Sequence, residues 1–287
     1  MQTIESGATK EKERQLFACL HGFGSAVVAY SGGVDSTYLL WAAHQALGVR
    51  CLAVLGESDS LARGEHAAAL AEARRLGTPV RVLATREMED ARYLANPSNR
   101  CYFCKSELYD RVADLARAEG FDAVLDGTNA DDLRDHRPGR AAAAERAVRS
   151  PLAEVGLKKA EIRELARQAG LRVWDKPAMP CLSSRVPYGM AITPGKLRQI
   201  ESAEGWLRAQ GFAVCRVRHY GEEARVEVPV GDLERLREGE LHGRMVAAFE
   251  ELGFARVQID PRGYRSGSLN EALAGGRRPA ASREDPR

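Results

Sequence analysis

Short apolar segments alternate with helical patterns through the first half of the chain, and this alternation constrains the fold more than any other feature. We expect strands at residues 25–30, 50–56, 80–85 and 123–126, with helices between them at 36–47, 62–76 and 103–119. Strands connected through helices form a parallel sheet that is covered on both faces. Ligands of such sheets bind at the carboxyl ends of the strands. The pattern therefore predicts an α/β domain with a Rossmann-like parallel sheet.

The pattern changes after residue 133. The Arg- and Ala-rich stretch 134–149 is either a mobile loop or a loosely packed helix. Further on, the order helix, strand, strand, helix, strand predicts a smaller α+β domain with an antiparallel pair, with elements at 194–210, 213–219, 224–229, 231–251 and 255–260. Residues from about 275 have the composition of a disordered tail. We place the domains at 1–150 and 151–272, with a tail at 273–287.

Composition excludes several classes of protein. The 287 residues carry a net charge of only +2, so no global field favours nucleic acid. No run approaches the roughly 18 apolar residues that cross a bilayer, and the N-terminus mixes both charge signs, unlike a signal peptide. Six cysteines without an export signal are typical of a reducing compartment, where they serve as thiols or metal ligands. We expect a cytoplasmic protein without membrane contact.

A glycine-rich turn follows the first expected strand and precedes an apolar helix. Adjacent glycines bring backbone N–H groups close to an anion, and the helix N-terminus adds positive potential. A carboxylate in such a turn suits a Mg²⁺ ion that bridges it to phosphate oxygens. Helix capping by serine and aspartate is the alternative. We expect the nucleotide-binding residues here to be Ser31, Gly32, Gly33, Asp35, Ser36 and Thr37, with Asp35 also binding magnesium.

Polar residues follow two other expected strands. Gly127 and Thr128 come after the fourth strand, at the edge that also carries the glycine turn, so we expect them to contact the nucleotide. Asp131 is a second candidate magnesium ligand, and Ser58 after the second strand is a candidate contact for the adenine side. The alternative for both segments is a polar turn.

Three of the six cysteines stand in polar surroundings. Cys101 and Cys104 form a C-x-x-C pair beside Arg100, and Cys181 lies in a proline-rich stretch close to Arg185. A metal site, a redox dithiol and mere bystanders all remain open. Three thiolates without an obvious fourth ligand suit a 4Fe–4S cluster with one open iron better than zinc. We expect the cationic neighbours to lower the thiol pKa values. The apolar surroundings of the remaining cysteines predict burial of Cys19, Cys51 and Cys215.

The motifs together resemble a known family. SGGVDS at 31–36 resembles the PP-loop of the adenine-nucleotide α-hydrolase superfamily, whose members cleave ATP between the α and β phosphates. Together with NPSNRCYFCK, DGTNADD, KPAMPCLSSRVPYG and DPRGYRSGSLN, it resembles the LarE family of ATP-dependent sulfur transferases over roughly residues 10–272. The resemblance implies a PP-loop domain followed by a substrate and sulfur-transfer domain.

The resemblance also implies an activity. It is the conversion of the carboxylates of pyridinium-3,5-biscarboxylic acid mononucleotide to thiocarboxylates, for the nickel-pincer cofactor of lactate racemase. Some members sacrifice the cysteine of the Pro-Cys-Leu motif, here Cys181, and others carry three cysteines and resemble cluster enzymes that pass on a sulfide. This chain matches the three-cysteine type, which implies Cys101, Cys104 and Cys181 as catalytic residues and cluster ligands. ATP, Mg²⁺ and a 4Fe–4S cluster are the implied cofactors.

The implied substrate carries a phosphate, so a second anion site is needed. Arginine forks suit phosphate, and alternate residues of a strand share a face. Glu222, Glu223 and Asp260 are candidates to orient these arginines. The residues that we expect to bind the phosphate are Ser184, Arg185, Arg216 and Arg218.

Three other functions remain open. They are a PP-loop enzyme that thiolates tRNA, an ammonia-using ligase with a structural metal, and a nucleotide sensor without chemistry. The near-zero net charge disfavours a stable nucleic-acid partner. The expected partners are a small nucleotide substrate, a sulfur donor for the cluster, and further copies of the chain, since the resemblance suggests a hexamer.

Overall fold

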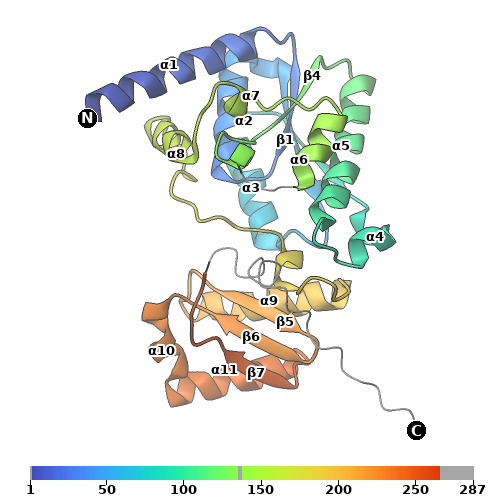
Figure 1. Ribbon diagram of the computed structural model, residues 1–287, viewed down its shortest axis with the longest axis vertical. Coiled ribbons are helices and arrows are strands. Elements are labelled where there is room, and N and C mark those ends of the chain that lie inside the picture. The colour runs from blue at the N-terminus through green and yellow to red at the C-terminus, as the bar shows by residue number, and fades with distance from the viewer. Residues whose placement is uncertain (1, 135–137, 266–287) are drawn as a thin grey trace. The chain divides into compact units, whose positions relative to one another are not determined.

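The computed structural model describes residues 2–134 and 138–265 (Figure 1). The expected tail at 273–287 lies outside these residues. The chain forms two compact units, one running through Cys181 (unit 1) and one beginning at Leu182 (unit 2). The functional boundary at 150/151 stays a prediction.

Unit 1 contains a four-stranded parallel sheet, which confirms the expected α/β class. Its strands are β1 (Ala26–Tyr30), β2 (Cys51–Glu57), β3 (Val80–Ala84) and β4 (Ala123–Asp126), in the order β3-β2-β1-β4. Every residue of β1 is buried because this strand is flanked on both sides and covered on both faces. The edge strand β3 is largely exposed.

Helices cover both faces of this sheet (Figure 1). One apolar cluster joins the sheet to α1 (Gln2–His21), α2 (Val34–Leu47), α3 (Arg63–Arg75) and α8 (Lys159–Gln168). A second cluster, on the other face, joins it to α5 (Arg100–Ala118) and α6 (Pro138–Glu145). Two short helices, α4 (Ala91–Leu94) and α7 (Pro151–Glu154), complete the unit together with single 3-10 turns at Gly48–Arg50, Glu87–Glu89 and Asp132–Arg134.

The Arg- and Ala-rich stretch after β4 is ordered where it is described. Ala142 and Ala143 of α6 are buried in the cluster that contains α5. Beyond α6, Arg149 N–H donates to Val124 O at 2.9 Å and Arg149 O accepts from Asp126 N–H at 2.9 Å. This isolated bridge extends the sheet beside β4, and it was not expected from the sequence.

Unit 2 has a three-stranded sheet in the order β5-β6-β7. Strands β5 (Arg216–Tyr220) and β6 (Glu223–Glu227) are antiparallel, as expected, and β7 (Arg256–Ile259) is parallel to β6. Its helices are α9 (Pro194–Ala209), α10 (Leu233–Arg237) and α11 (Gly239–Glu251), with 3-10 turns at Leu182–Arg185 and Val230–Asp232. The single helix expected at 231–251 is divided because Glu238 adopts an extended conformation, with φ −55° and ψ 131°.

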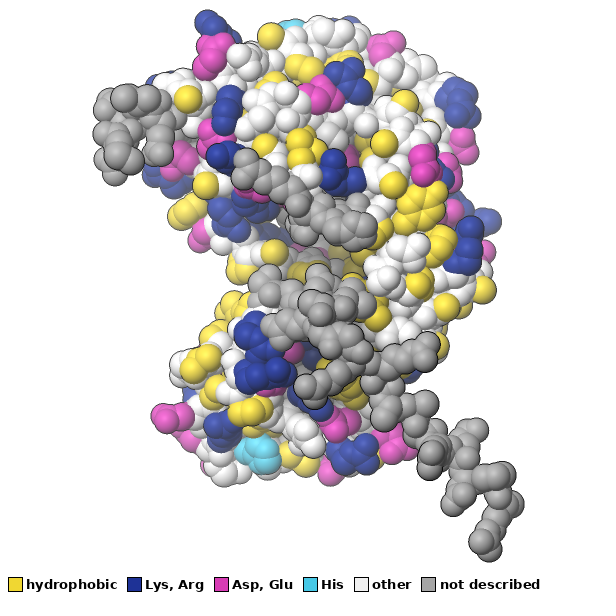
Figure 2. Space-filling model, in the orientation of Figure 1, with side chains coloured by type: hydrophobic (Ala, Val, Ile, Leu, Met, Phe, Trp, Pro, Cys, Tyr) yellow, Lys and Arg dark blue, Asp and Glu magenta, His cyan; other side chains and the backbone are white. Residues whose placement is uncertain are grey.

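Surface charges of both signs are interspersed on the face of unit 1 shown in Figure 2. Ion pairs such as Arg146–Asp110 at 2.6 Å and Arg149–Glu154 at 2.6 Å lie in this unit. Within the described parts of the chain, no helix has the length and apolar character to cross a membrane.

Candidate functional site

The two expected nucleotide segments of unit 1 meet at one edge of the sheet. Strand β1 lies between β2 and β4. After β1 the chain forms β2 and β3 on one side of it, and it later returns to form β4 on the other side of β1. Such a switch point opens a crevice at the carboxyl ends of the two strands. A Cβ atom on Gly127 would lie 2.8 Å from Ser36 N and 2.9 Å from Ser36 Cα. The structure therefore brings Gly127 directly against the start of α2.

Close packing and internal hydrogen bonds shape the glycine turn, residues 31–37. Gly32 has a φ of +71°, and a Cβ there would lie 2.6 Å from Ala69 Cβ of α3. Ser36 Oγ accepts from Ser31 N–H at 3.2 Å and donates to Gly33 O at 3.1 Å. The Thr37 side chain is fully buried and donates to the Tyr30 hydroxyl at 3.5 Å, so its hydroxyl faces the protein interior.

Asp35 is the candidate magnesium ligand in this turn. Its Oδ2 forms an ion pair with Lys159 Nζ of α8, while its buried Oδ1 has no hydrogen-bond partner among the residues that the structure describes. Burial raises the pKa of Asp35, and the Lys159 ammonium opposes that shift. Asp131 accepts from the Lys159 backbone N–H at 2.9 Å, so Lys159 connects the two carboxylates. This donor set fits Mg²⁺, which takes one or two protein carboxylates together with phosphate oxygens and water.

The Asp126 carboxylate fixes Thr128 and itself accepts four hydrogen bonds. Asp126 accepts from Thr128 N–H at 3.1 Å, Thr128 Oγ1 at 2.9 Å, Tyr109 Oη at 2.9 Å and Ser150 Oγ at 2.7 Å. With four donors on its two oxygens, Asp126 is a positioning group for the turn after β4.

A second lysine at this edge was not predicted from the sequence. Lys176 Nζ donates to Gly32 O at 3.2 Å and pairs with Glu65 at 2.8 Å. It opens the motif KPAMPCLSSRVPYG, but nothing in the sequence places it at the glycine turn. Ser58, the candidate for the adenine side, contacts Ser60 Oγ at 2.8 Å in the loop after β2.

The three candidate cysteines interact electrostatically in unit 1. Cys101 is exposed, whereas Cys104 and Cys181 are half-buried. Burial raises the pKa of Cys104, and Glu87, Cys181 and Cys101 raise it further, against the opposing charge of Lys105. The expectation that cationic neighbours lower the thiol pKa is thus wrong for Cys104, because desolvation outweighs the one nearby ammonium.

These thiols are not pre-arranged as a metal site. Among residues 2–134 and 138–265, no group of three Cys, His, Asp or Glu side chains is placed to hold a metal ion. Thiols are nevertheless the donor type that a 4Fe–4S cluster uses, and all three cysteines are in the thiol form. Arg100, next to the pair, is buried and donates to Asn96 Oδ1 at 2.7 Å. Cys51 and Cys215 are buried as expected, but Cys19 is only half-buried.

The candidate phosphate-binding arginines of unit 2 form buried ion pairs. Arg185 pairs with Glu204 at 2.8 Å, and Arg218 pairs with Glu227 at 2.8 Å. Arg218 also donates to Ser184 O at 2.8 Å, so these two expected residues are in contact. Arg216 lies over the Tyr264 ring, and burial together with Arg185 lowers its pKa.

The glutamates that orient these arginines are ones that the sequence did not single out. Glu204 comes from α9 and Glu227 from the end of β6. Among the candidates that the sequence did suggest, Glu223 pairs with Arg225 at 2.8 Å and Asp260 with Arg262 at 2.9 Å.

Comparison with known proteins identifies the family. No family model matches the chain. An uncharacterised protein of Synechocystis sp. is 46% identical over 92% of this chain and 97% of its own length. The pyridinium-3,5-bisthiocarboxylic acid mononucleotide synthase of Lactiplantibacillus plantarum is 35% identical over 91% of this chain and 95% of its own length. The chain belongs to the LarE family. An uncharacterised protein of Methanocaldococcus jannaschii is 28% identical over 84% of this chain and 90% of its own.

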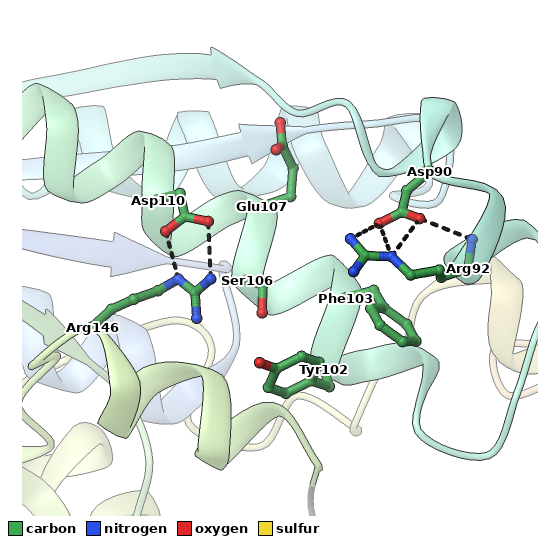
Figure 3. Close-up of a pocket in the computed structure, with 8 residues that line it drawn as sticks. All are labelled: Asp90, Arg92, Tyr102, Phe103, Ser106, Glu107, Asp110 and Arg146. Carbon is green, nitrogen blue, oxygen red and sulfur yellow. Dashed lines mark hydrogen bonds and ion pairs between the residues drawn. The ribbon is translucent and has the colours of Figure 1, made fainter.

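A pocket in this LarE-family chain lies on α5 (Figure 3). Its volume is about 170 Å³, and Arg92–Asp90 and Arg146–Asp110 pairs line it, with Ser106 between them. None of the expected nucleotide or thiol residues contributes to it. The pocket therefore does not coincide with the predicted nucleotide site.

Proposed function

We propose that this protein is an ATP-dependent sulfur transferase that converts the carboxylates of pyridinium-3,5-biscarboxylic acid mononucleotide to thiocarboxylates. The product serves the nickel-pincer cofactor of lactate racemase. The observation that carries the proposal is the 35% identity, over almost the full length of both chains, to a relative named as the synthase of the bisthiocarboxylic acid mononucleotide. The proposal includes ATP and Mg²⁺ as co-substrate and cofactor.

The first half-reaction activates a carboxylate. A carboxylate oxygen is a poor leaving group, and transfer of AMP to it makes a good one while pyrophosphate is released. The backbone N–H groups of the glycine turn, together with Lys159 beside Asp35, would bind the phosphates. Asp35 and Asp131 would hold the Mg²⁺ ion that neutralises charge on the departing pyrophosphate.

The second half-reaction brings sulfur to the acyl-adenylate. Its carbonyl carbon accepts an electron pair from sulfur, and AMP leaves with the oxygen. We propose that Cys101, Cys104 and Cys181 hold a 4Fe–4S cluster, which when bound supplies a transferable sulfide. The C-x-x-C pair of Cys101 and Cys104, together with Cys181 in the Pro-Cys-Leu motif, supports this assignment. Direct attack by Cys181 is the other route, and it would consume that side chain. Each product needs two sulfur atoms, so the cluster route would operate twice, whereas the direct route would consume Cys181 of two chains.

The arginines of unit 2 would bind the substrate phosphate. Arg185, Arg216 and Arg218 are buried, and Ser184 contacts Arg218. Glu204 and Glu227 accept from Nε and Nη2 of Arg185 and Arg218, so they fix the two guanidinium groups in place, and a substrate phosphate would compete with these carboxylates for the same fork.

Incubation with ATP, Mg²⁺ and the biscarboxylic acid mononucleotide tests the proposal. We expect release of pyrophosphate and AMP, and a mass change of the substrate equal to replacement of oxygen by sulfur. Amide formation with ammonium, or thiolation of tRNA in its place, would contradict it.

Cys181→Ala is expected to abolish sulfur transfer while pyrophosphate release continues, because the carboxylate is still activated. Cys19→Ala, which changes a half-buried cysteine elsewhere in unit 1, serves as the control and should retain both activities. Measurement of pyrophosphate and of thiocarboxylate by mass spectrometry separates the two steps. Thiocarboxylate formation by the Cys181 variant would remove this residue from the mechanism.

A further inference from the structure

Lys176 contacts the backbone of the glycine turn, and the proposed reaction gives this lysine no role. Its Nζ donates to Gly32 O at 3.2 Å and forms an ion pair with Glu65 Oε2 at 2.8 Å. Glu65 lies one helical turn before Ala69, the residue of α3 that packs against Gly32, so both face the glycine turn. Only 20% of the Lys176 side chain is exposed. Its ammonium is therefore held beside the turn by contacts to two elements.

The backbone around Lys176 is fixed as well. Arg163 of α8 donates to Trp174 O at 2.8 Å and to Lys176 O at 2.7 Å, and Lys176 N–H donates to Val173 O at 3.1 Å. A guanidinium group that holds two carbonyls in this way leaves the segment little freedom. Because ordering a long lysine side chain costs conformational entropy, contacts at both ends of Lys176 indicate a specific task for its ammonium.

The carbonyl that Lys176 holds belongs to the peptide between Gly32 and Gly33. No peptide bond of the described residues is cis, and in a trans peptide the C=O and N–H groups point in opposite directions. The Gly33 N–H therefore points away from Lys176, and it has no acceptor among the residues that the structure describes. Glycine on both sides would let this peptide turn over at little steric cost. A cationic donor on its carbonyl opposes that rotation and makes the N–H a stronger donor.

We propose that Lys176 is a positioning residue of the nucleotide site, which fixes the Gly32–Gly33 peptide so that the Gly33 N–H donates to the β- or γ-phosphate of ATP. The inference rests on the proposed function, because it requires a triphosphate in the glycine turn. These two phosphates are the ones concerned, since the Mg²⁺ ion proposed at Asp35 neutralises the departing pyrophosphate. Lys176 acts through the backbone, and Glu65 and Arg163 hold it in place.

Calorimetric titration of the full chain tests the assignment, with AMP and with an ATP analogue whose α and β phosphates are joined by a methylene group. Lys176→Met roughly keeps the length of the side chain and removes its donors. We expect it to bind the analogue about tenfold more weakly and AMP within about twofold of the wild type, because AMP lacks the β and γ phosphates. Lys176→Arg keeps a cationic donor and should recover most of the affinity. Lys158→Met removes the same charge from an exposed lysine just before α8, and this matched control should bind as the wild type does.

A second measurement follows the peptide itself without nucleotide. In the ¹H–¹⁵N spectrum of the wild type, the Gly33 amide should give one signal, and in Lys176→Met this signal should broaden or split as the peptide samples both orientations. Equal losses of affinity for AMP and for the analogue, with an unchanged Gly33 signal, would make Lys176 merely structural and overturn the inference. Unchanged affinities would overturn the inference alone. A wild type that binds no analogue would overturn it together with the nucleotide site of the proposed function.

Discussion

Gly127 shows how closely single residues determine the nucleotide edge. Its missing Cβ leaves room for Ser36 N, and the Cβ of an alanine there would lie 2.8 Å from that atom, which is a backbone atom that cannot rotate away. We expect Gly127→Ala to displace the start of α2 and to weaken binding of a non-hydrolysable ATP analogue at least about tenfold, or about 1.4 kcal/mol. Isothermal titration calorimetry measures the change. Gly64→Ala is the control, because a Cβ there would have no atom within 4 Å and the residue is helical.

At the same scale, His219 makes the stability of unit 2 depend on pH. Burial and the nearby Lys196 ammonium lower the pKa of His219 to about 4, and Nε2 contacts Gln199 Oε1 at 2.9 Å. Between pH 4 and 6.5 the unfolded chain binds more protons than the folded one, so stability rises with pH in this window. We expect a loss on the order of 2 kcal/mol as pH falls from 7 to 4. Urea unfolding of His219→Gln should show a smaller loss, and an equal loss in the variant would contradict the assignment.

Individual residues of the candidate site could be predicted from the sequence where they belong to a local motif. The glycine turn and the segment after β4 were predicted, because parallel strands end at one edge. Lys159 and Lys176 were missed. Each is one charged residue on a distant helix or loop, and only the tertiary fold places it beside Asp35 or Gly32.

At the scale of elements, α3 is packed unusually close to the glycine turn. Gly32→Ala adds both the strain of a positive φ and a contact of 2.6 Å with Ala69 Cβ. Gly77→Ala has a similar φ, +69°, with no atom within 4 Å, and so reports the strain alone. We expect Gly77→Ala to cost about 1 kcal/mol and Gly32→Ala roughly a further 1–3 kcal/mol. Thermal unfolding measures both, and equal costs would mean that α3 moves aside freely.

Helices and strands whose apolar residues recur at regular spacing could be predicted from the sequence. Elements that depend on tertiary contacts could not. The parallel strands and long helices of unit 1 follow from runs of apolar residues, whose burial on both sides of the sheet the structure confirms. The β-bridge at Arg149 was missed because a single polar residue cannot show the alternating pattern of a strand. The division of the helix expected at 231–251 was missed although Gly239 follows Glu238, because a single glycine inside a helical pattern is often tolerated.

At the scale of the whole molecule, the two units have separate apolar cores. Phe249 belongs to the core of unit 2, where it packs against Trp206 with ring centroids 6.2 Å apart. We expect Phe249→Ala to destabilise unit 2 by about 3–5 kcal/mol. Amides of β5 and β6 should then exchange hydrogen faster, while those of β1 keep the protection of the wild type. Faster exchange in β1 to the same degree would show that both units unfold together.

The contact between Gly127 and Ser36 also limits how this chain can vary during evolution. The two turns are distant in sequence, yet each occupies space that the other would need in order to gain a side chain or an insertion. A change in one turn survives only beside a compensating change in the other. Among related sequences, the lengths of these two turns are therefore expected to be inherited as a pair.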